Sequence, residues 1–370
     1  MFSRSLYTTL LSFVLLALVT CSPNNDAEKE RENNLLLAII ANPSTEGYVS
    51  SSDGTKIFYA KVGTGIPVVV LHGGPGLDHN YLVEPLKATM PGHQLIFFDQ
   101  RGTGFSEGNF NQINSSFINK TKFLQDLDAI RTGLNLGDQI NILGHSWGGL
   151  YAMLYATDAT YKSHVKSLAL VSSAGAQHQY FFGTAQSFFS RLVTKAGGDA
   201  TAAQARLNVV QTPVDPSKSG YAPTLKALKE YYAFLFKKYF NDYLPTPTAL
   251  DGSSENFRVL NLDFISEKTI RNGVAVSNLL NTELGIGAGT GSLDIRASLG
   301  VITAPVKLIH GNNDVVPIDY IINTTNQDAN SVETALTGVV ESKVIISNCG
   351  HFPFIEKPTE FAAAMSGFFQ

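Results

Sequence analysis

Short, almost continuous apolar runs recur along the chain and constrain its fold more than any other feature. Runs of Val, Ile, Leu and Phe of this length are typical of parallel strands that are covered on both faces. Between two of them, Lys120–Leu134 keeps its apolar residues at helical spacing. The predicted strands are Lys56–Val62, Pro67–His72, His93–Asp99, Gln139–Gly144, Ser167–Ser172 and Val306–Gly311. Strands that alternate with helices predict an α/β fold with a mostly parallel, doubly wound sheet.

The pattern changes between residues 177 and 299, where mostly helical sequence replaces the apolar runs, and Leu225–Pro247 within it is dense in Tyr and Phe. Because this stretch lies between two predicted strands, the chain must leave the sheet layer and return to it. Ligands bind at the carboxyl ends of the strands in open α/β sheets. We therefore expect residues 177–299 to form an inserted, mainly helical cap over that edge, and residues 47–176 and 300–370 to form the core.

The N-terminal residues carry the pattern of an export signal. The apolar run Leu6–Thr20 follows Arg4, is short for a bilayer span and suits the core of a signal peptide. It ends in LVTC, which resembles a bacterial lipobox. We expect residues 1–21 to be a signal peptide ending in this motif, Cys21 to be lipidated, and residues 22–46 to be a flexible tether. Because Thr20 departs from the usual small residue, an ordinary cleaved signal peptide is the alternative.

These N-terminal features predict the location of the protein. A lipidated Cys21 would anchor a protein that is exported from a bacterial cytoplasm, on the periplasmic or outer-membrane side. The rest of the composition restricts the other partners. Charged residues make up 16% of the chain and the net charge is −4. Because no basic stripe is visible, we expect no nucleic-acid partner.

The cysteine content excludes two further kinds of structure. The chain contains only two cysteines, Cys21 and Cys349. Two cysteines cannot build a disulfide framework, and they cannot form a zinc cluster of cysteines. We expect no metal and no cofactor, and Cys349 is interpreted as a small buried apolar residue.

The segment NILGHSWGG contains the first chemical motif. Ser146 stands between Gly144 and Gly148, directly after an apolar run. Glycines at these positions let the backbone turn tightly around the serine. Gly-x-Ser-x-Gly between a strand and a helix is the signature of a nucleophile elbow. The motif therefore predicts Ser146 as a nucleophile.

A serine hydroxyl becomes a good nucleophile only beside a base, which in turn needs an acid to orient it. In elbow-type hydrolases the chain order is Ser, then Asp or Glu, then His. Asp314 follows the predicted strand Val306–Gly311, and His351 follows the apolar KVIIS. We predict a triad of Ser146, Asp314 and His351, since His351 alone combines the required chain order with the required loop. The competing candidates are His72, His145 and His310 for the base, and Asp319 and Asp328 for the acid.

A glycine-rich turn supplies a candidate oxyanion site. The segment HGGPG (72–76) follows a predicted strand, and its glycines leave backbone N–H groups uncovered. Tetrahedral intermediates carry an oxyanion that needs such preorganised donors. The elbow template takes one donor from this loop and one from the residue after the nucleophile. We therefore assign Gly74 and Trp147 as the donors.

Three segments together, HGGPG (72–76), FFDQRGTGFS (97–106) and GHSWGG (144–149), with Asp314 and His351, resemble the α/β-hydrolase superfamily. Within it they resemble the prolyl aminopeptidase (proline iminopeptidase) family. The resemblance runs from Gly47 to Gln370 and is weakest through the cap. It implies the α/β-hydrolase fold and a small-molecule or short-peptide substrate. It also implies a serine hydrolase that releases N-terminal residues, often proline, from peptides through an acyl-enzyme.

The resemblance also suggests roles for residues outside the triad. Asp99 and Arg101 belong to the family signature and are interpreted as a charged pair that braces the loop beside the oxyanion turn. Family members hold the free α-amine of the substrate with acidic groups. Glu283, in NTELGIGAG, occupies the corresponding neighbourhood at the end of the cap. Some members place a second glutamate directly after the catalytic aspartate, where this chain has Val315.

Two other functions stay open. One is a carboxylesterase or other acyl hydrolase with the same triad and an apolar pocket under the aromatic cap. The other is a non-catalytic binding module, since a fold does not fix a function. Haloalkane dehalogenases and epoxide hydrolases need a carboxylate nucleophile, so Ser146 argues against both.

Overall fold

The computed structural model describes residues 44–181, 209, 212–214, 219–222, 224, 227, 266–286, 291–314, 316–324 and 331–370. The predicted signal peptide with Cys21, residues 22–43 of the predicted tether, and most of the predicted cap lie outside these ranges. Within these ranges, no helix is both long enough and apolar enough to cross a bilayer.

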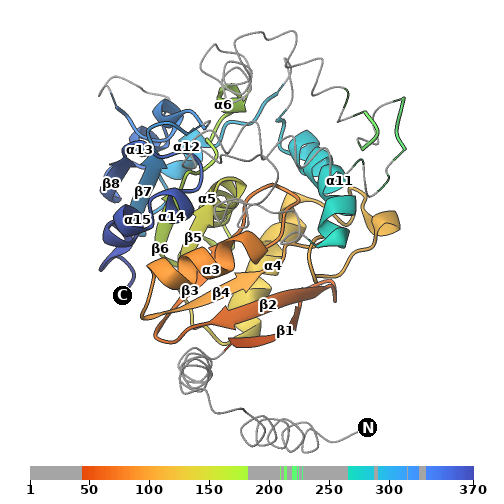
Figure 1. Ribbon diagram of the computed structural model, residues 1–370, viewed down its shortest axis with the longest axis horizontal. Coiled ribbons are helices and arrows are strands. Elements are labelled where there is room, and N and C mark those ends of the chain that lie inside the picture. Colours follow the sequence, from red (N-terminus) through yellow and green to blue (C-terminus); the bar gives the residue numbers. More distant parts are fainter. Residues whose placement is uncertain are drawn as a thin grey trace, which may run out of the picture. The chain divides into compact units, whose positions relative to one another are not determined.

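A single eight-stranded sheet, in the order β1-β2-β4-β3-β5-β6-β7-β8, runs through the core (Figure 1). β2 pairs antiparallel with both β1 and β4, whereas every neighbouring pair from β4 to β8 is parallel. The predicted mostly parallel sheet is thus confirmed. The strands are β1 (Ser44–Ser50), β2 (Lys56–Val62), β3 (Ile66–Leu71), β4 (His93–Phe98), β5 (Ile140–His145), β6 (Val165–Val171), β7 (Val306–Gly311) and β8 (Val340–Ile346).

The first strand begins earlier than the sequence predicts. β1 starts at Ser44, so residues 44–46 belong to the sheet and not to the predicted tether. Among the side chains of this strand whose burial the structure describes, only Val49 belongs to the buried core. A largely polar edge strand has no continuous apolar run, which is why the sequence pattern does not indicate it.

Helices cover both faces of the sheet, because alternate residues of a strand point to opposite faces. In β3, Val69 and Leu71 join one hydrophobic cluster, while Val68 and Val70 join the other. The first cluster includes side chains of α4 (Lys120–Gly133), α5 (Trp147–Thr157), α11 (Glu267–Glu283), α12 (Arg296–Leu299) and α13 (Val332–Ala335). The second includes side chains of α3 (Asn80–Thr89), α14 (Pro353–Glu356) and α15 (Pro358–Met365).

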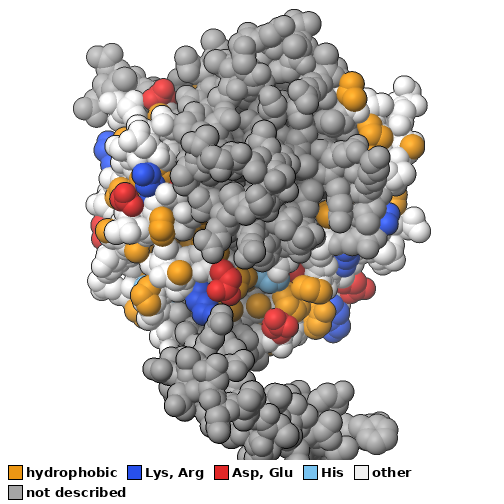
Figure 2. All heavy atoms as spheres, in the orientation of Figure 1, with side chains coloured by type: hydrophobic (Ala, Val, Ile, Leu, Met, Phe, Trp, Pro, Cys, Tyr) orange, Lys and Arg blue, Asp and Glu red, His pale blue; other side chains and the backbone are white. Residues whose placement is uncertain are grey.

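Short helical segments complete the described elements, and they lie in the connections. They are η1 (Phe110–Gln112), η2 (Lys162–His164), α6 (His178–Phe181) and η5 (Ile318–Tyr320). Of the described elements, α6, α11 and α12 fall within the predicted cap. On the surface in Figure 2, the visible Lys, Arg, Asp and Glu side chains of the described residues are scattered among hydrophobic ones.

Candidate active site

Ser146 lies in the tight turn that joins β5 to α5. Its backbone has φ 55° and ψ −123°, a conformation that costs a non-glycine residue of order 1–3 kcal/mol. Three backbone hydrogen bonds hold it there. The N–H of Ser146 donates to the carbonyl of Val171 (3.1 Å), and its own carbonyl accepts the N–H groups of Gly149 and Ala174 (2.9 Å each). The strained serine is therefore fixed by β6 and α5.

The glycines beside Ser146 are required by close backbone approach. A Cβ atom on Gly144 would overlap the carbonyl oxygen of Gly148, and one on Gly148 would overlap the carbonyl oxygen of Leu71 in β3. Neither obstacle is a flexible side chain. The start of α5 can pack against β5 and β3 only because both positions lack a side chain.

Asp314 and His351 are brought together at the carboxyl ends of β7 and β8. Nδ1 of His351 lies 3.0 Å from Oδ1 and 3.1 Å from Oδ2 of Asp314, and both residues are buried. Oδ1 of Asp314 also accepts the N–H of Val316 (2.8 Å). Burial opposes ionisation of Asp314, but the charges of His351 and His310 and these hydrogen bonds lower the pKa of Asp314 to about 2. The carboxylate is therefore ionised at neutral pH and positioned to hold the proton of Nδ1.

His351 lies beside the elbow of Ser146. The imidazole of His145, which precedes Ser146, has its centroid 4.8 Å from that of His351. Nε2 of His145 is 2.9 Å from the carbonyl oxygen of His351. The loops after β5 and β8 are thus in direct contact, as expected for parallel strands that end at the same edge of a sheet.

The loop His72–Gly76 passes directly beside Ser146. A Cβ atom on Gly73 would lie 3.2 Å from that of Ser146. The N–H of Gly73 donates to the hydroxyl of Tyr81 (2.7 Å), and Pro75 has no N–H. Gly74, which lies between Gly73 and Pro75, therefore has a backbone N–H that can donate to a bound oxyanion. Trp147 is the first residue of α5, and an N–H in the first turn of a helix has no partner within that helix.

Gln100 connects the side chain of Trp147 to His72, the first residue of the HGGPG turn, and was missed from the sequence. Its side-chain oxygen accepts the indole N–H of Trp147 (3.2 Å). Its backbone N–H donates to Nε2 of His72 (3.1 Å), and its side-chain amide donates to the carbonyl of His72 (3.0 Å). Gln100 is buried. The only sequence signal is its place in the motif FFDQRGTGFS.

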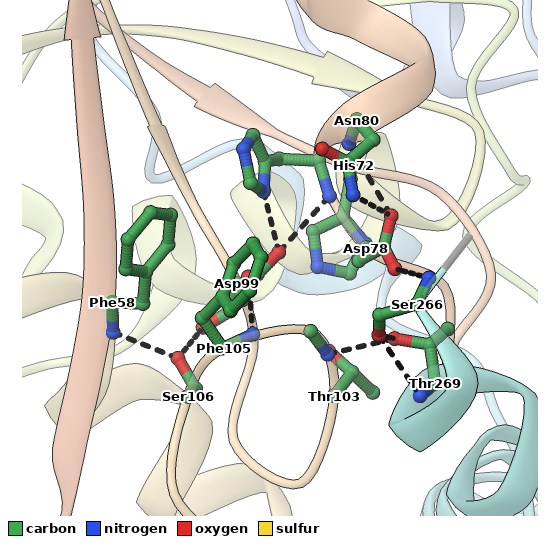
Figure 3. A network of polar contacts seen from close by, with 12 residues as sticks. Phe58, His72, Asp78, Asn80, Asp99, Thr103, Phe105, Ser106, Ser266 and Thr269 are labelled. Carbon is green, nitrogen blue, oxygen red and sulfur yellow. Dashed lines mark hydrogen bonds and ion pairs between the residues drawn. The ribbon is translucent and has the colours of Figure 1, made fainter. Parts of the chain in front are cut away.

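Asp99 and Arg101 do not form the predicted pair with each other. Asp99 accepts the backbone N–H of His79 (3.0 Å), and its Oδ1 lies 2.7 Å from Nδ1 of the same residue. Asp99 also accepts the N–H of Phe105 (2.7 Å) (Figure 3). Ser106 donates its hydroxyl to the Asp99 carbonyl and accepts the N–H of Phe58. Asp99 therefore joins the start of α3 to the 99–106 loop, with His79 in the place predicted for Arg101.

Arg101 is paired elsewhere. Its guanidinium donates to both oxygens of Asp126 in α4 (2.7 and 2.6 Å) and to Asp53 after β1 (3.0 Å). Arg101 and Asp126 are both fully buried, which makes this a desolvated bidentate pair. The structural roles predicted for Asp99 and Arg101 hold, but each residue acts with its own partner.

Helix α11, within the predicted cap, is bound to the same loop. Thr269 accepts the N–H of Gly104 (2.7 Å), and the side chain of Asn272 donates to the carbonyls of Gly102 and Gly108 (2.7 and 3.1 Å). The N–H of Ser266, visible in Figure 3, donates to Asp78 (3.0 Å), two residues after the HGGPG turn. This end of the predicted cap is thus fixed next to the oxyanion loop.

Glu283 lies at the other end of α11, exposed to solvent. Its carboxylate accepts the backbone N–H of Lys120, the first residue of α4 (2.6 Å). A carboxylate at the first turn of a helix stabilises the helix by satisfying an N–H without an internal partner. This contact gives Glu283 a structural function, and its role in binding a substrate amine stays a prediction.

The remaining candidates have additional or other partners, or are not described. His72 contacts Gln100. His310 lies 3.6 Å from Oδ2 of Asp314 through Nε2, and the same nitrogen is 3.0 Å from the carbonyl oxygen of Val316. Asp319 lies in η5 and accepts the hydroxyl of Thr324. Asp328 and Val315 lie outside the described residues. In the part of the chain that the structure describes, no group of three or more His, Cys, Asp or Glu could hold a metal ion.

The sequence is similar to a known protein family and to curated proteins. Residues 66–358 match the family described as alpha/beta hydrolase fold. The chain is 38% identical over 133 residues to the proline iminopeptidase of Clostridioides difficile (strain 630), covering 35% of this chain and 43% of that relative. The chain thus spans less than half of the length of this curated relative.

Solved structures extend the likeness to most of the chain. A proline iminopeptidase from Mycobacterium smegmatis is 21% identical with a TM-score of 0.55, covering 88% of this chain and 97% of that one. An esterase from a Rhodococcus species is 20% identical with a TM-score of 0.55, covering 88% of this chain and 98% of that one. At these identities the likeness concerns the fold alone.

Proposed function

The chain belongs to the α/β-hydrolase family, and we propose that it is a serine hydrolase that acts through an acyl-enzyme on Ser146. The observation that carries the proposal is the buried contact of His351 with Asp314 (3.0 and 3.1 Å) beside the elbow. A strained serine, an oriented histidine and a glycine turn meet at one edge of the sheet. A non-catalytic binding module would not need this combination.

In the proposed reaction, Oγ of Ser146 attacks the substrate carbonyl carbon while Nε2 of His351 takes the serine proton. The carbonyl oxygen becomes an oxyanion that accepts hydrogen bonds from the N–H groups of Gly74 and Trp147. His351 then gives its proton to the leaving amine or alcohol, and the acyl group stays on Ser146. Water repeats the sequence with His351 as the base and frees the acid product. Asp314 remains ionised throughout and stabilises the imidazolium.

We further propose that the substrate is a short peptide with a free N-terminus, and that the enzyme releases its N-terminal residue, proline in particular. The support is the 38% identity to a proline iminopeptidase, together with the segments HGGPG and GHSWGG. The 38% match covers only part of each chain. The proposal therefore depends on shared motifs around the site and not on a whole-length match.

A carboxylesterase is the second candidate, and a specific observation favours it. The carboxylate of Glu283, predicted to hold the substrate amine, accepts the N–H of Lys120 (2.6 Å). Val315 stands where some family members have a second acid. A site without a dedicated acid for the α-ammonium would accept neutral esters as readily as free-amine peptides.

One substrate panel separates the two candidates. Prolyl and other aminoacyl arylamides, their N-acetylated forms and p-nitrophenyl esters are compared on the protein without its first 21 residues. An aminopeptidase should lose turnover when the amine is acetylated. Glu283→Gln should then raise KM for free-amine substrates by an amount worth about 1–3 kcal/mol, with ester hydrolysis unchanged. Equal turnover of blocked and free substrates would assign the enzyme as an esterase.

We also propose that the mature protein is a membrane-anchored lipoprotein, exported from a bacterial cytoplasm and lipidated at Cys21. The support is the apolar run Leu6–Thr20 followed by cysteine. The anchored protein should partition into the detergent phase, and Cys21→Ser should release it or block its processing. Recovery of unmodified wild-type protein in a soluble periplasmic fraction would contradict the anchor.

A further inference from the structure

Tyr81 and His145 lie between the oxyanion loop, the elbow and the loop of His351. We propose that these two side chains are positioning residues, which hold the three loops in register through one chain of hydrogen bonds. The inference rests on the proposed serine chemistry, and it concerns how the donors and the base are kept in place.

The two backbone groups at the ends of this chain of hydrogen bonds determine which atom donates in each bond. The backbone N–H of Gly73 can only donate, so the Tyr81 hydroxyl accepts it (2.7 Å). The hydroxyl proton is then directed to Nδ1 of His145 (2.8 Å). The carbonyl of His351 can only accept, so Nε2 of His145 carries the proton and donates it (2.9 Å). The partners therefore fix a single tautomer of His145.

The chain of bonds is buried and neutral. Tyr81 is 7% exposed and His145 is 1% exposed. Burial, followed by the charge of His351, lowers the pKa of His145 to about 3, and burial raises the pKa of Tyr81. The ring of Phe354 packs against His145, with 5.0 Å between the two ring centroids. In such surroundings hydrogen bonds are strong, and unpaired polar groups are costly.

The geometry links each bond to a group in the proposed reaction. Gly73 precedes Gly74, so the bond to the N–H of Gly73 anchors the peptide unit before the one that carries the N–H of Gly74, and it restrains where that donor lies. The carbonyl of His351 belongs to the base itself, so holding it restrains the approach of the imidazole to Ser146. The oxyanion and the imidazolium exist in the transition state and not in the bound substrate. Both effects therefore stabilise the transition state and hardly change the affinity for the substrate.

Tyr81→Phe tests the chain directly, because it removes one oxygen and keeps the ring. We expect kcat to fall by about 10- to 100-fold, less than the roughly 100- to 1,000-fold cost of removing an oxyanion donor outright, with KM within about twofold. Tyr155→Phe is the matched control. Tyr155 is also buried, lies near the end of α5 opposite to Ser146, and donates its hydroxyl to Asp128 in α4 (2.9 Å). The kcat of Tyr155→Phe should stay within about twofold of the wild type. Thermal melts of both variants show whether the lower kcat of Tyr81→Phe comes from a less stable protein or from displaced catalytic groups.

Two further variants test the direction of the bonds and do not depend on Tyr81→Phe folding. His145→Gln can place an amide N–H near the position of Nε2 and keep the donor to the His351 carbonyl. His145→Asn places its amide near Nδ1 and loses that donor. Both side chains are polar and smaller than histidine. We expect kcat of the glutamine variant to exceed that of the asparagine variant by about fivefold or more. Equal values would overturn the proposed link to His351.

The failure of this inference differs from the failure of the proposed function. If the wild type does not react with a fluorophosphonate at Ser146, the serine chemistry is wrong and the inference has no basis. If the wild type reacts, and Tyr81→Phe reacts at the same rate with an unchanged kcat, the serine chemistry stands and the positioning role is wrong. A slower fluorophosphonate reaction and a lower kcat in Tyr81→Phe, at unchanged KM, support the positioning role.

Discussion

At the scale of single residues, Gly148 beside the nucleophile has little freedom to change. A Cβ atom there would overlap the Leu71 carbonyl of β3. Gly148→Ala should therefore lower the free energy of unfolding by about 1–3 kcal/mol or more, measured by urea denaturation. Gly300→Ala is the control, since Gly300 has φ −63° and a Cβ atom there would meet nothing closer than 3.6 Å. A Gly148→Ala protein as stable as Gly300→Ala would contradict the close approach at the elbow.

Residues with a sequence motif could be predicted, whereas those that act through tertiary contacts could not. Ser146 was indicated by its glycines, and Asp314 and His351 by their order and their place after strands. The structure places these last two in contact. Tyr81 gives no such signal, because a tyrosine in an amphipathic helix is typical of a core residue. It contacts His145, 64 positions away, and only the fold creates that contact.

At the scale of elements, the pair of Arg101 and Asp126 joins the 99–106 loop to α4. Because both side chains are fully buried, Arg101→Leu would leave Asp126 as an unpaired buried carboxylate. We expect a loss of about 3–5 kcal/mol in unfolding free energy. The double variant Arg101→Leu/Asp126→Leu should recover part of it.

A surface pair provides the control for this prediction. Lys343 and Glu333 are 2.8 Å apart at an exposed site. Lys343→Ala should change stability by no more than about 1 kcal/mol. Equal losses for Arg101→Leu and Lys343→Ala would show that the buried pair does not hold the loop to α4.

The elements of the core could be predicted because both faces of their strands are buried. β2 and β7 have the bounds that the sequence indicates, and β3 to β6 differ by only one or two residues at an end. β1 was missed because an exposed polar edge strand has no apolar run. The separate partners of Asp99 and Arg101 were also missed, since charges adjacent in sequence need not pair in space.

At the scale of the whole molecule, the pair of His79 and Asp99 should make stability depend on pH. Their atoms Nδ1 and Oδ1 are 2.7 Å apart. Burial opposes charge on both groups, but their mutual attraction and hydrogen bond raise the pKa of His79 and lower the pKa of Asp99. The contribution of Asp99 is present above its unfolded pKa, about 3.9, and is lost as the pH falls through its folded pKa. That of His79 is present below about 6.5 and is lost as the pH rises through its folded pKa.

Both contributions are therefore complete between about pH 4 and 6.5. His79→Gln should destabilise the protein most near pH 5, and the difference from the wild type should shrink above neutral pH. Urea denaturation at pH 5 and at pH 9 measures it. A difference of the same size at both values would show that the pair carries no charge in the folded protein.

The central claim is that Ser146 is the nucleophile of a serine hydrolase, and covalent labelling tests it most directly. The protein without its first 21 residues is treated with a fluorophosphonate, digested, and mapped by mass spectrometry, beside Ser146→Ala and His351→Ala. We predict one adduct, on Ser146, absent from Ser146→Ala and formed orders of magnitude more slowly in His351→Ala. An adduct that persists in Ser146→Ala, or a wild type that forms none, would contradict the claim.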